Sequence, residues 1–169
     1  MCIRDSVTAA DIVKLASEML PDLTGCGTNC GVGAAEVVAA MMNMKKSCTE
    51  FPEPPAFIAK ANCGIPEYVD GKIVYNGTPE LMGRYAQLAF DAGASIIGGC
   101  CGTSPEHIKA MKEALDGYER KAAPTLEEIV AELGEVSVGA TSQLNGDMSV
   151  AGGSVSGASK RRSRRKRPA

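Results

Sequence analysis

The sequence predicts an α/β fold in which parallel strands alternate with helices, and three observations support it. Short apolar segments alternate with amphipathic segments between residues 7 and 117. Two of the amphipathic segments open on Ser or Thr followed by Pro and Glu, which is typical of a helix start. The apolar segments end in turns rich in Gly and Cys. A doubly wound sheet and part of a (β/α)₈ barrel both satisfy this pattern, and both place functional residues after the strand ends.

The first two helices follow from the helical spacing of their apolar side chains. Residues 11–20 place four such side chains on one helical face: Ile12, Leu15, Ala16 and Met19. A short strand-like segment at 22–27 then leads into the turn GCGTNCGVG. The second helix is expected near 33–46, where Val37, Val38, Met41 and Met42 recur at helical spacing and should pack inward.

The third element is a compact apolar segment at 56–61, AFIAKA, which is typical of a buried parallel strand. It ends in the loop NCGIP, and we expect the acidic side chains that follow, Glu67 and Asp70, to lie in a solvated loop.

The last strand–helix unit has the clearest signals. Thr78-Pro79-Glu80 opens a helix with Leu81, Tyr85, Leu88 and Ala89 facing inward, and Gly93 ends it. Residues 94–97 form the next strand, followed by the turn GGCCGT at 98–103. Ser104-Pro105-Glu106 opens a helix that should bury Ile108, Met111 and Leu115. His107, the one histidine, falls in its first turn and is expected to be a capping or surface residue.

The chain changes character after Gly117. Thr125 and Glu128 form a capping-box pattern that predicts a short helix to about Leu133. Gly, Ser, Ala and Val then dominate, and residues 151–169 are predicted to be disordered. Residues 160–169 hold seven of the 18 Lys and Arg, which leaves 11 basic against 20 acidic side chains in the rest. An acidic body disfavours a nucleic-acid-binding fold, and no apolar run is long enough for a membrane span.

Seven cysteines, an odd number, in a chain without a visible secretory signal predict reduced thiols in the cytoplasm. Cys30 follows one strand and Cys100–Cys101 follow another, so a parallel sheet brings their three sulfurs to one rim. Both sulfurs of the adjacent pair can face one metal only if the strand breaks, which the surrounding glycines permit. Three thiolates with an open fourth position fit a catalytic Zn²⁺, whereas buried apolar thiols are the simpler alternative. Cys26 and Cys63 are not expected to be ligands.

Three motifs carry a resemblance to a known family: GTNCG at 27–31, ANCGIP at 61–66 and GGCCGT at 98–103. Together they resemble the homocysteine S-methyltransferase family, and most closely its betaine–homocysteine methyltransferase-like members. The resemblance implies Zn²⁺ held by Cys30, Cys100 and Cys101, and a homocysteine pocket lined by Asn62, Gly64, Pro66, Asn29 and Gly99. It also implies a fold: about three βα units from the C-terminal portion of a (β/α)₈ TIM barrel, followed by a disordered tail.

The implied function is transfer of a methyl group to the homocysteine thiolate, forming methionine, with betaine or a related small molecule as donor. The resemblance spans residues 7–120, with 121–150 as an extension carrying a short helix and 1–6 as foreign sequence. A whole barrel needs about 250 residues, so the chain looks like a fragment that is inactive alone and requires a complementing N-terminal half or an oligomer. The alternative is a non-catalytic zinc- or thiol-binding module with a basic, partner-binding tail.

Overall fold

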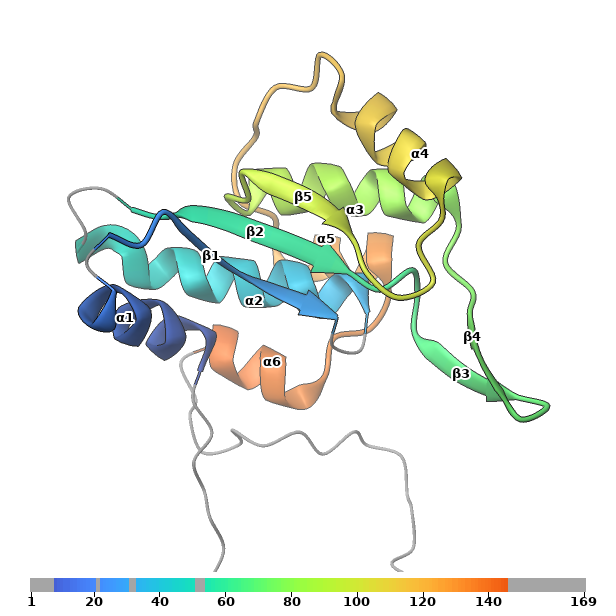
Figure 1. Cartoon of the computed structure of the whole chain (residues 1–169), viewed down its shortest axis with the longest axis horizontal. Coiled ribbons are helices and arrows are strands. Elements are labelled where there is room, and N and C mark those ends of the chain that lie inside the picture. The colour runs from blue at the N-terminus through green and yellow to red at the C-terminus, as the bar shows by residue number, and fades with distance from the viewer. Residues whose placement is uncertain (1–7, 21, 31–32, 51–53, 146–169) are drawn as a thin grey trace, which may run out of the picture.

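The computed structural model describes residues 8–20, 22–30, 33–50 and 54–145 and shows a parallel sheet packed against helices (Figure 1). In chain order its elements are α1 (Ala9–Met19), β1 (Gly25–Cys30), α2 (Ala34–Lys46), the 3₁₀ helix η1 (Ser47–Glu50), β2 (Ala56–Ala61), β3 (Pro66–Val69), β4 (Lys72–Tyr75), α3 (Pro79–Asp91), β5 (Ile96–Gly99), α4 (Pro105–Leu115), α5 (Leu126–Leu133) and α6 (Val138–Leu144).

The main sheet has three parallel strands in the order β1-β2-β5, which confirms the predicted α/β class. Spatial order follows chain order, with α2 joining β1 to β2 and α3 lying between β2 and β5. These two helices contact each other on one face of the sheet (Figure 1). The outer strands lie further along the chain than the sequence predicted, at 25–30 instead of 22–27 and at 96–99 instead of 94–97.

The core lies between the sheet and the helices α2 and α3. Phe57, Ala59 and Ala61 alternate along β2 toward the helices, whereas Lys60 between them is exposed. On the helices, the predicted packing of Val37, Val38, Met41, Tyr85, Leu88 and Ala89 is confirmed, since all are buried. With few aromatic residues in the chain, long flexible methionines fill much of this space.

The predicted helix starts are confirmed at α3, α4 and α5. The Thr78 hydroxyl accepts a hydrogen bond from Leu81 N, and both Ser104 and Thr125 form capping boxes. In α4 the prediction of a buried apolar face is only partly correct. Met111 is buried, but Ile108 is 48% exposed because α4 contacts α3 and β5 along a single narrow face.

The apolar face predicted for the first helix does not enter the core. Ile12, Leu15 and Met19 are 48%, 50% and 70% exposed, and Val13 is the side chain that α1 buries. Helix α1 contacts α2 and η1, which meet it on the Val13 side. The exposed stripe is therefore an apolar surface of the described part of the chain.

A hairpin of β3 and β4 replaces the loop predicted around Glu67 and Asp70. The two strands pair antiparallel from Pro66 with Tyr75 to Val69 with Lys72, and the hairpin projects from the rest of the fold (Figure 1). Its turn is Asp70-Gly71, and both residues have positive φ, 48° and 81°. Asp-Gly between β-branched and aromatic residues is a strong hairpin signal. The Asp-Gly pair was thus a signal for this hairpin in the sequence itself.

Asp91, at the end of α3, forms hydrogen bonds that hold the segment following α4 in place. Its carboxylate is 8% exposed and accepts hydrogen bonds of 2.8 Å from both the Tyr118 hydroxyl and the Lys121 backbone N–H. We expect Asp91→Ala to lower the free energy of unfolding by about 2 kcal/mol, because two donors lose a charged acceptor. Tyr118→Phe removes one of these bonds and should cost less. Denaturant unfolding measures both, and equal stability of wild type and Asp91→Ala would contradict this role.

Two sequence predictions lie outside the described residues: the foreign segment 1–6 and the disordered segment 151–169. The short helix α6, which begins with Ser137 as its N-cap, was not predicted. Across the described ranges, no helix combines the length and apolar character that a membrane crossing requires.

Candidate metal centre

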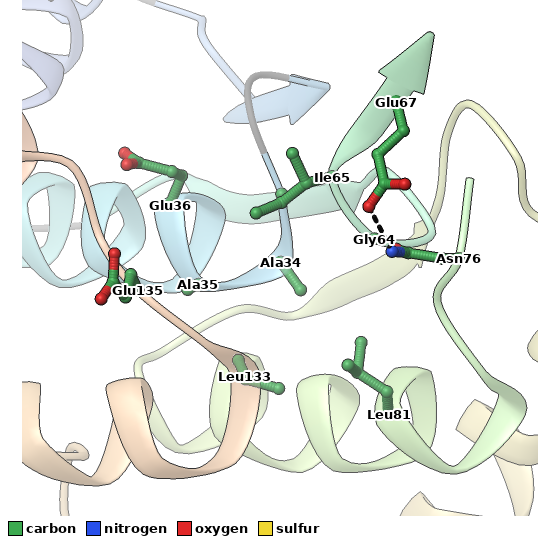
Figure 2. Close-up of a pocket in the computed structure, with 11 residues that line it drawn as sticks. Ala34, Ala35, Glu36, Gly64, Ile65, Glu67, Asn76, Leu81, Leu133 and Glu135 are labelled. Carbon is green, nitrogen blue, oxygen red and sulfur yellow. Dashed lines mark hydrogen bonds between the residues drawn. The ribbon is translucent and has the colours of Figure 1, made fainter. Parts of the chain in front are cut away.

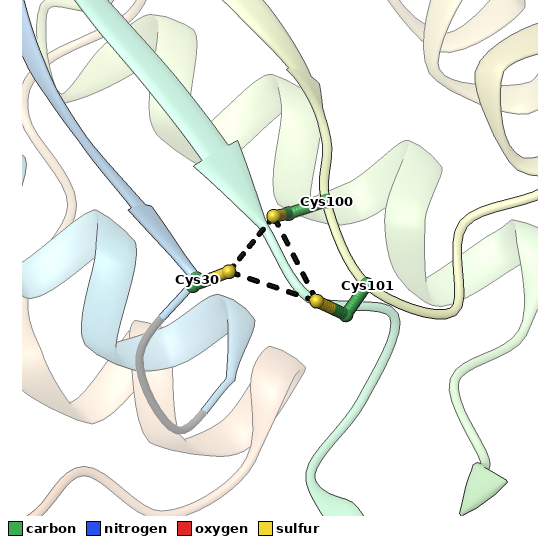
Figure 3. Close-up of side chains that lie close together, drawn as sticks. All are labelled: Cys30, Cys100 and Cys101. Carbon is green, nitrogen blue, oxygen red and sulfur yellow. Dashed lines mark hydrogen bonds between the residues drawn. The ribbon is translucent and has the colours of Figure 1, made fainter.

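Three cysteines meet at the carboxyl end of the parallel sheet. Cys30 is the last residue of β1, and Cys100 and Cys101 directly follow β5 (Figure 3). Between these strands lies β2, so side chains 70 residues apart in sequence come within contact distance across the sheet end. The sequence predicted this convergence, although it placed Cys30 just past its strand.

Backbone geometry turns the three side chains toward one point. Cys30 has φ of 59°, an uncommon conformation for a residue other than glycine. After Gly99 the chain leaves the sheet, and Gly102 adopts φ of 75° in the turn that follows. A Cβ on Gly102 would lie 2.4 Å from the Tyr75 ring, so glycine is required there on two grounds. The predicted break in the strand is thus present, and Gly102 supplies the left-handed residue.

The three sulfurs form a compact triangle (Figure 3). The Sγ–Sγ distances are 2.8 Å for Cys30–Cys100, 3.7 Å for Cys30–Cys101 and 4.0 Å for Cys100–Cys101. Cys30 and Cys100 are partly buried and Cys101 is exposed, so the triangle is open to solvent on one side. Such a group of thiols could hold a metal ion.

The thiols perturb one another electrostatically. Hydrogen bonds to Cys100 and Cys101 raise the pKa of Cys30 to about 11. The pKa of Cys100 is lowered, chiefly by its hydrogen bond with Cys30. These opposite directions mean that, in the metal-free chain, Cys100 loses its proton more readily than Cys30 does.

Backbone hydrogen bonds fix the turn that carries the adjacent pair. Cys100 N donates to Ala61 O at 2.7 Å, which extends the β2–β5 ladder to the first ligand candidate. Cys101 N donates to the buried Asn62 side chain at 3.2 Å, and Cys101 O accepts from Cys63 N at 2.9 Å. The last residue of β2 and the loop that follows it therefore hold the Cys100–Cys101 turn at three points.

The remaining described cysteines lie outside the triangle, as predicted. Cys63 is 1% exposed and its thiol donates to Gly77 O at 3.2 Å. Cys26 lies within β1 opposite Phe57, and Cys48 is a buried residue of η1. Burial raises the pKa of all three thiols. Among the described residues, the group that could hold a metal ion has three members, and a tetrahedral ion held by them would have a fourth position for another ligand.

The five residues expected to line a homocysteine pocket do not all lie together. Asn62 contacts Cys101, a side-chain hydrogen bond from Asn29 helps lower the pKa of Cys100, and Gly99 immediately precedes Cys100. Gly64 instead lines a separate pocket of about 210 Å³, and Pro66 begins the exposed strand β3. The substrate-binding role of all five stays a prediction.

The pocket that includes Gly64 lies between the start of α2, the base of the hairpin and α3 (Figure 2). Its acidic side chains are Glu36, Glu67 and Glu135, and its apolar wall includes Ile65, Leu81 and Leu133. Gly64 has φ of 86°, and a Cβ there would lie 2.6 Å from Gly77 N. In this structure, the absence of a side chain at Gly64 allows the backbones of two turns to approach each other closely.

Two contacts in this region, made by Tyr75 and His107, were not predicted from the sequence. Tyr75, at the end of β4, packs against Gly102, and a hydrogen bond to Cys101 raises the pKa of its hydroxyl. Its proximity depends on the hairpin, which was not predicted. His107 was expected to be a capping or surface residue, and capping is the alternative that the structure shows, but its contact from Nε2 to Gly77 O at 3.2 Å had no signal in the sequence.

Comparison with known protein families agrees with this arrangement. The sequence model of the homocysteine S-methyltransferase family matches residues 1–115, which include all three strands of the main sheet and the whole cysteine triangle. The match covers more than half of the chain and ends with the last residue of α4. This chain belongs to the homocysteine S-methyltransferase family.

Proposed function

We propose that this chain binds Zn²⁺ through Cys30, Cys100 and Cys101 and presents the homocysteine sulfur for methyl transfer, forming methionine. The observation that carries the proposal is the convergence of three thiols, with a solvent-open side, in a chain of this family. An open fourth position is what distinguishes catalytic from structural zinc sites.

The sulfur geometry fits the metal. Tetrahedral zinc with Zn–S bonds of about 2.3 Å separates its sulfur ligands by about 3.8 Å. Two of the three distances, 3.7 and 4.0 Å, agree with this value, and the 2.8 Å between Cys30 and Cys100 requires those sulfurs to separate by about 1 Å. When bound, zinc would supply the Lewis acidity that keeps a substrate thiol ionised at neutral pH.

The chain's own residues then have distinct tasks. The three thiolates give the site its negative charge and leave one side for the substrate sulfur. Asn62 holds the Cys101 amide, so its side chain keeps the second ligand of the pair in place. Asn29, Gly99 and the N-x-G-x-P turn at 62–66 are proposed to shape the amino-acid pocket. The homocysteine thiolate would attack the donor methyl group directly, and the demethylated donor would leave with the electron pair of the broken bond. No covalent intermediate with the enzyme is therefore needed, and alignment of the two substrates would supply most of the rate.

We also propose that further strands complete the sheet into a (β/α)₈ barrel. Among the described residues, β1 and β5 have a strand neighbour on one side only. The sequential strand order, with α2 and α3 on one face, supports a barrel over a doubly wound sheet, in which the order reverses. The isolated 169-residue chain is accordingly expected to be inactive or to need a complementing fragment, and methionine formation by the purified chain alone would overturn this.

Substitution of the metal by Co²⁺ tests the proposed function. Homocysteine should change the thiolate-to-cobalt absorption of the loaded chain, whereas methionine, whose sulfur cannot ionise, should not. Addition of betaine, S-methylmethionine or methylcobalamin to the homocysteine-loaded chain with a complementing fragment identifies the donor by methionine formation. A cobalt spectrum that homocysteine leaves unchanged would contradict the proposal.

Zinc affinity is expected to fall as pH falls. The pKa of Cys30 is raised to about 11, so at neutral pH its proton must leave before the sulfur binds metal. A raised thiol pKa strengthens proton competition, and the affinity should therefore increase with pH throughout the neutral range. Competition titration against a chelator at several pH values measures the slope. An affinity that does not vary with pH would contradict thiolate ligation.

A further inference from the structure

The His107 ring makes a hydrogen bond to a backbone group at each nitrogen, and its Nδ1 also lies 2.8 Å from the Ser104 hydroxyl. Its Nδ1 lies 3.0 Å from Ser104 N, and its Nε2 lies 3.2 Å from Gly77 O. A backbone N–H can only donate and a carbonyl can only accept, so Nδ1 must be unprotonated and Nε2 must carry the hydrogen. These backbone partners match the Nε2–H tautomer, in which both ring nitrogens are already engaged in hydrogen bonds.

Gly77, the acceptor of the Nε2–H bond, is joined to the loop after β2. Gly77 N donates to Cys63 O at 3.1 Å, and the Cys63 thiol donates back to Gly77 O. The backbones are in close contact, since a Cβ on Gly77 would lie 2.6 Å from the Cys63 carbonyl carbon. Motion of Gly77 is thus transmitted directly to Cys63.

Cys63 also holds the Cys100–Cys101 turn in place. Its backbone N donates to Cys101 O at 2.9 Å, while the turn closes on itself through Thr103 N and Cys100 O at 3.3 Å. Ser104, the N-cap of α4, follows immediately and donates to His107. These hydrogen bonds, together with the backbone from Cys101 to Ser104, form a closed circuit. It runs from His107 through Gly77, Cys63 and Cys101, and returns to His107 through Ser104.

We propose that His107 is a positioning residue for the metal site. Its Nε2–H bond to Gly77 closes this circuit and holds the Cys100–Cys101 turn where both sulfurs face Cys30. The inference rests on the proposed function in so far as these cysteines are metal ligands. It assigns to His107 a task beyond helix capping, for which one ring nitrogen would suffice.

Two uncharged variants separate capping from positioning, and the chain itself shows that both can cap. In α1, Asp11 reaches Thr8 N from the same helical position, and in α5 Glu128 reaches Thr125 N. Asn has the side-chain length of Asp and Gln that of Glu, so His107→Asn and His107→Gln should both retain the α4 cap. Only Gln is long enough to place a donor near the position of Nε2.

The first readout uses the metal-free chain. Amide hydrogen exchange at Cys63 and Cys101 should become at least tenfold faster in His107→Asn and return to near the wild-type rate in His107→Gln, while thermal unfolding midpoints of the two variants stay alike. Since His107 is the one histidine, ¹⁵N NMR of the ring also reports its tautomer without ambiguity. Unchanged exchange in His107→Asn, or a ring protonated at Nδ1, would overturn the proposal.

The second readout is zinc affinity, measured by chelator competition. His107→Asn should bind zinc about tenfold more weakly, the lower end of the range for partners that orient metal ligands, and His107→Gln should bind within a few-fold of wild type. Equal affinity of wild type and His107→Asn would overturn the positioning role. If the wild type binds no zinc, the proposed function fails, and the exchange rates of the metal-free chain still decide the role of His107.

Discussion

Cys100→Ser should weaken zinc binding by about a hundredfold or more, because the site loses one of three thiolates. Zinc sites in small domains gain about 10–16 kcal/mol in total from their ligands, so one thiolate of a full set is worth about 3 kcal/mol. Cys100 is also the thiol whose pKa is lowered by Cys30 and is therefore the most readily ionised of that pair. Metal content after purification and competition against a chelator give the two measurements.

Cys26→Ala is the matched control for this substitution. Cys26 lies in β1 with Cys30 but pairs with Phe57 and takes no part in the triangle. Its loss should leave about one zinc per chain. Full zinc content in Cys100→Ser, or loss of zinc in Cys26→Ala, would show that the ligand set has been assigned wrongly.

Gly27→Ala should lower the free energy of unfolding by about 3 kcal/mol and disrupt the metal site with it. A Cβ on Gly27 would lie 2.0 Å from Ile58 O and 2.7 Å from Ile58 C, which are backbone atoms of the neighbouring strand. Because these atoms cannot rotate away, β1 and β2 must move apart. Cys30, three residues along β1, would move with the strand and away from Cys100.

Gly98→Ala provides the comparison within the same sheet. Gly98 pairs with Lys60 in the β2–β5 ladder, and the nearest atom to an added Cβ is Lys60 Cγ at 3.9 Å, an ordinary contact. The free energy of unfolding of the Gly98→Ala variant should differ from that of the wild type by less than about 1 kcal/mol. Denaturant unfolding of both variants, with zinc content, tests the contrast, and similar stabilities would refute the steric argument.

The convergence of Cys30, Cys100 and Cys101 could be predicted because it depends on few physical rules. Parallel strands end at one rim of a sheet, and a Gly-Cys-Cys-Gly sequence allows the backbone to break where two adjacent sulfurs must share a face. The caps of α3 and α4 were equally accessible, since Thr78 and Ser104 act through bonds to nearby residues. Local interactions and strand direction were sufficient to predict these features from the sequence.

Strand limits were less predictable because glycines give no side-chain pattern. The strand expected at 94–97 extends instead to Gly99, where Gly98 and Gly99 remain in the ladder opposite Lys60 and Ala61. The same difficulty explains why the predicted limits of β1 were wrong, because two of its residues, Gly25 and Gly27, lack side chains. Backbone pairing with β2, a contact distant in sequence, decides where both strands end.

The contacts of Tyr75 and His107 could not have been derived from one sequence. Tyr75 reaches Cys101 because β4 returns along β3 toward the Gly102 turn. His107 meets Gly77, 30 residues earlier, because α3 and α4 pack side by side. Both contacts require the assembled tertiary structure, whereas the motifs indicate only residues that lie within the motifs themselves.

X-ray absorption of the zinc-loaded chain, with and without homocysteine, tests the central claim most directly. It counts the sulfur atoms bound to zinc. The account predicts three sulfurs from Cys30, Cys100 and Cys101, and a fourth when homocysteine is added. Four sulfurs before homocysteine is added, with no change afterwards, would contradict the account and indicate a closed structural site.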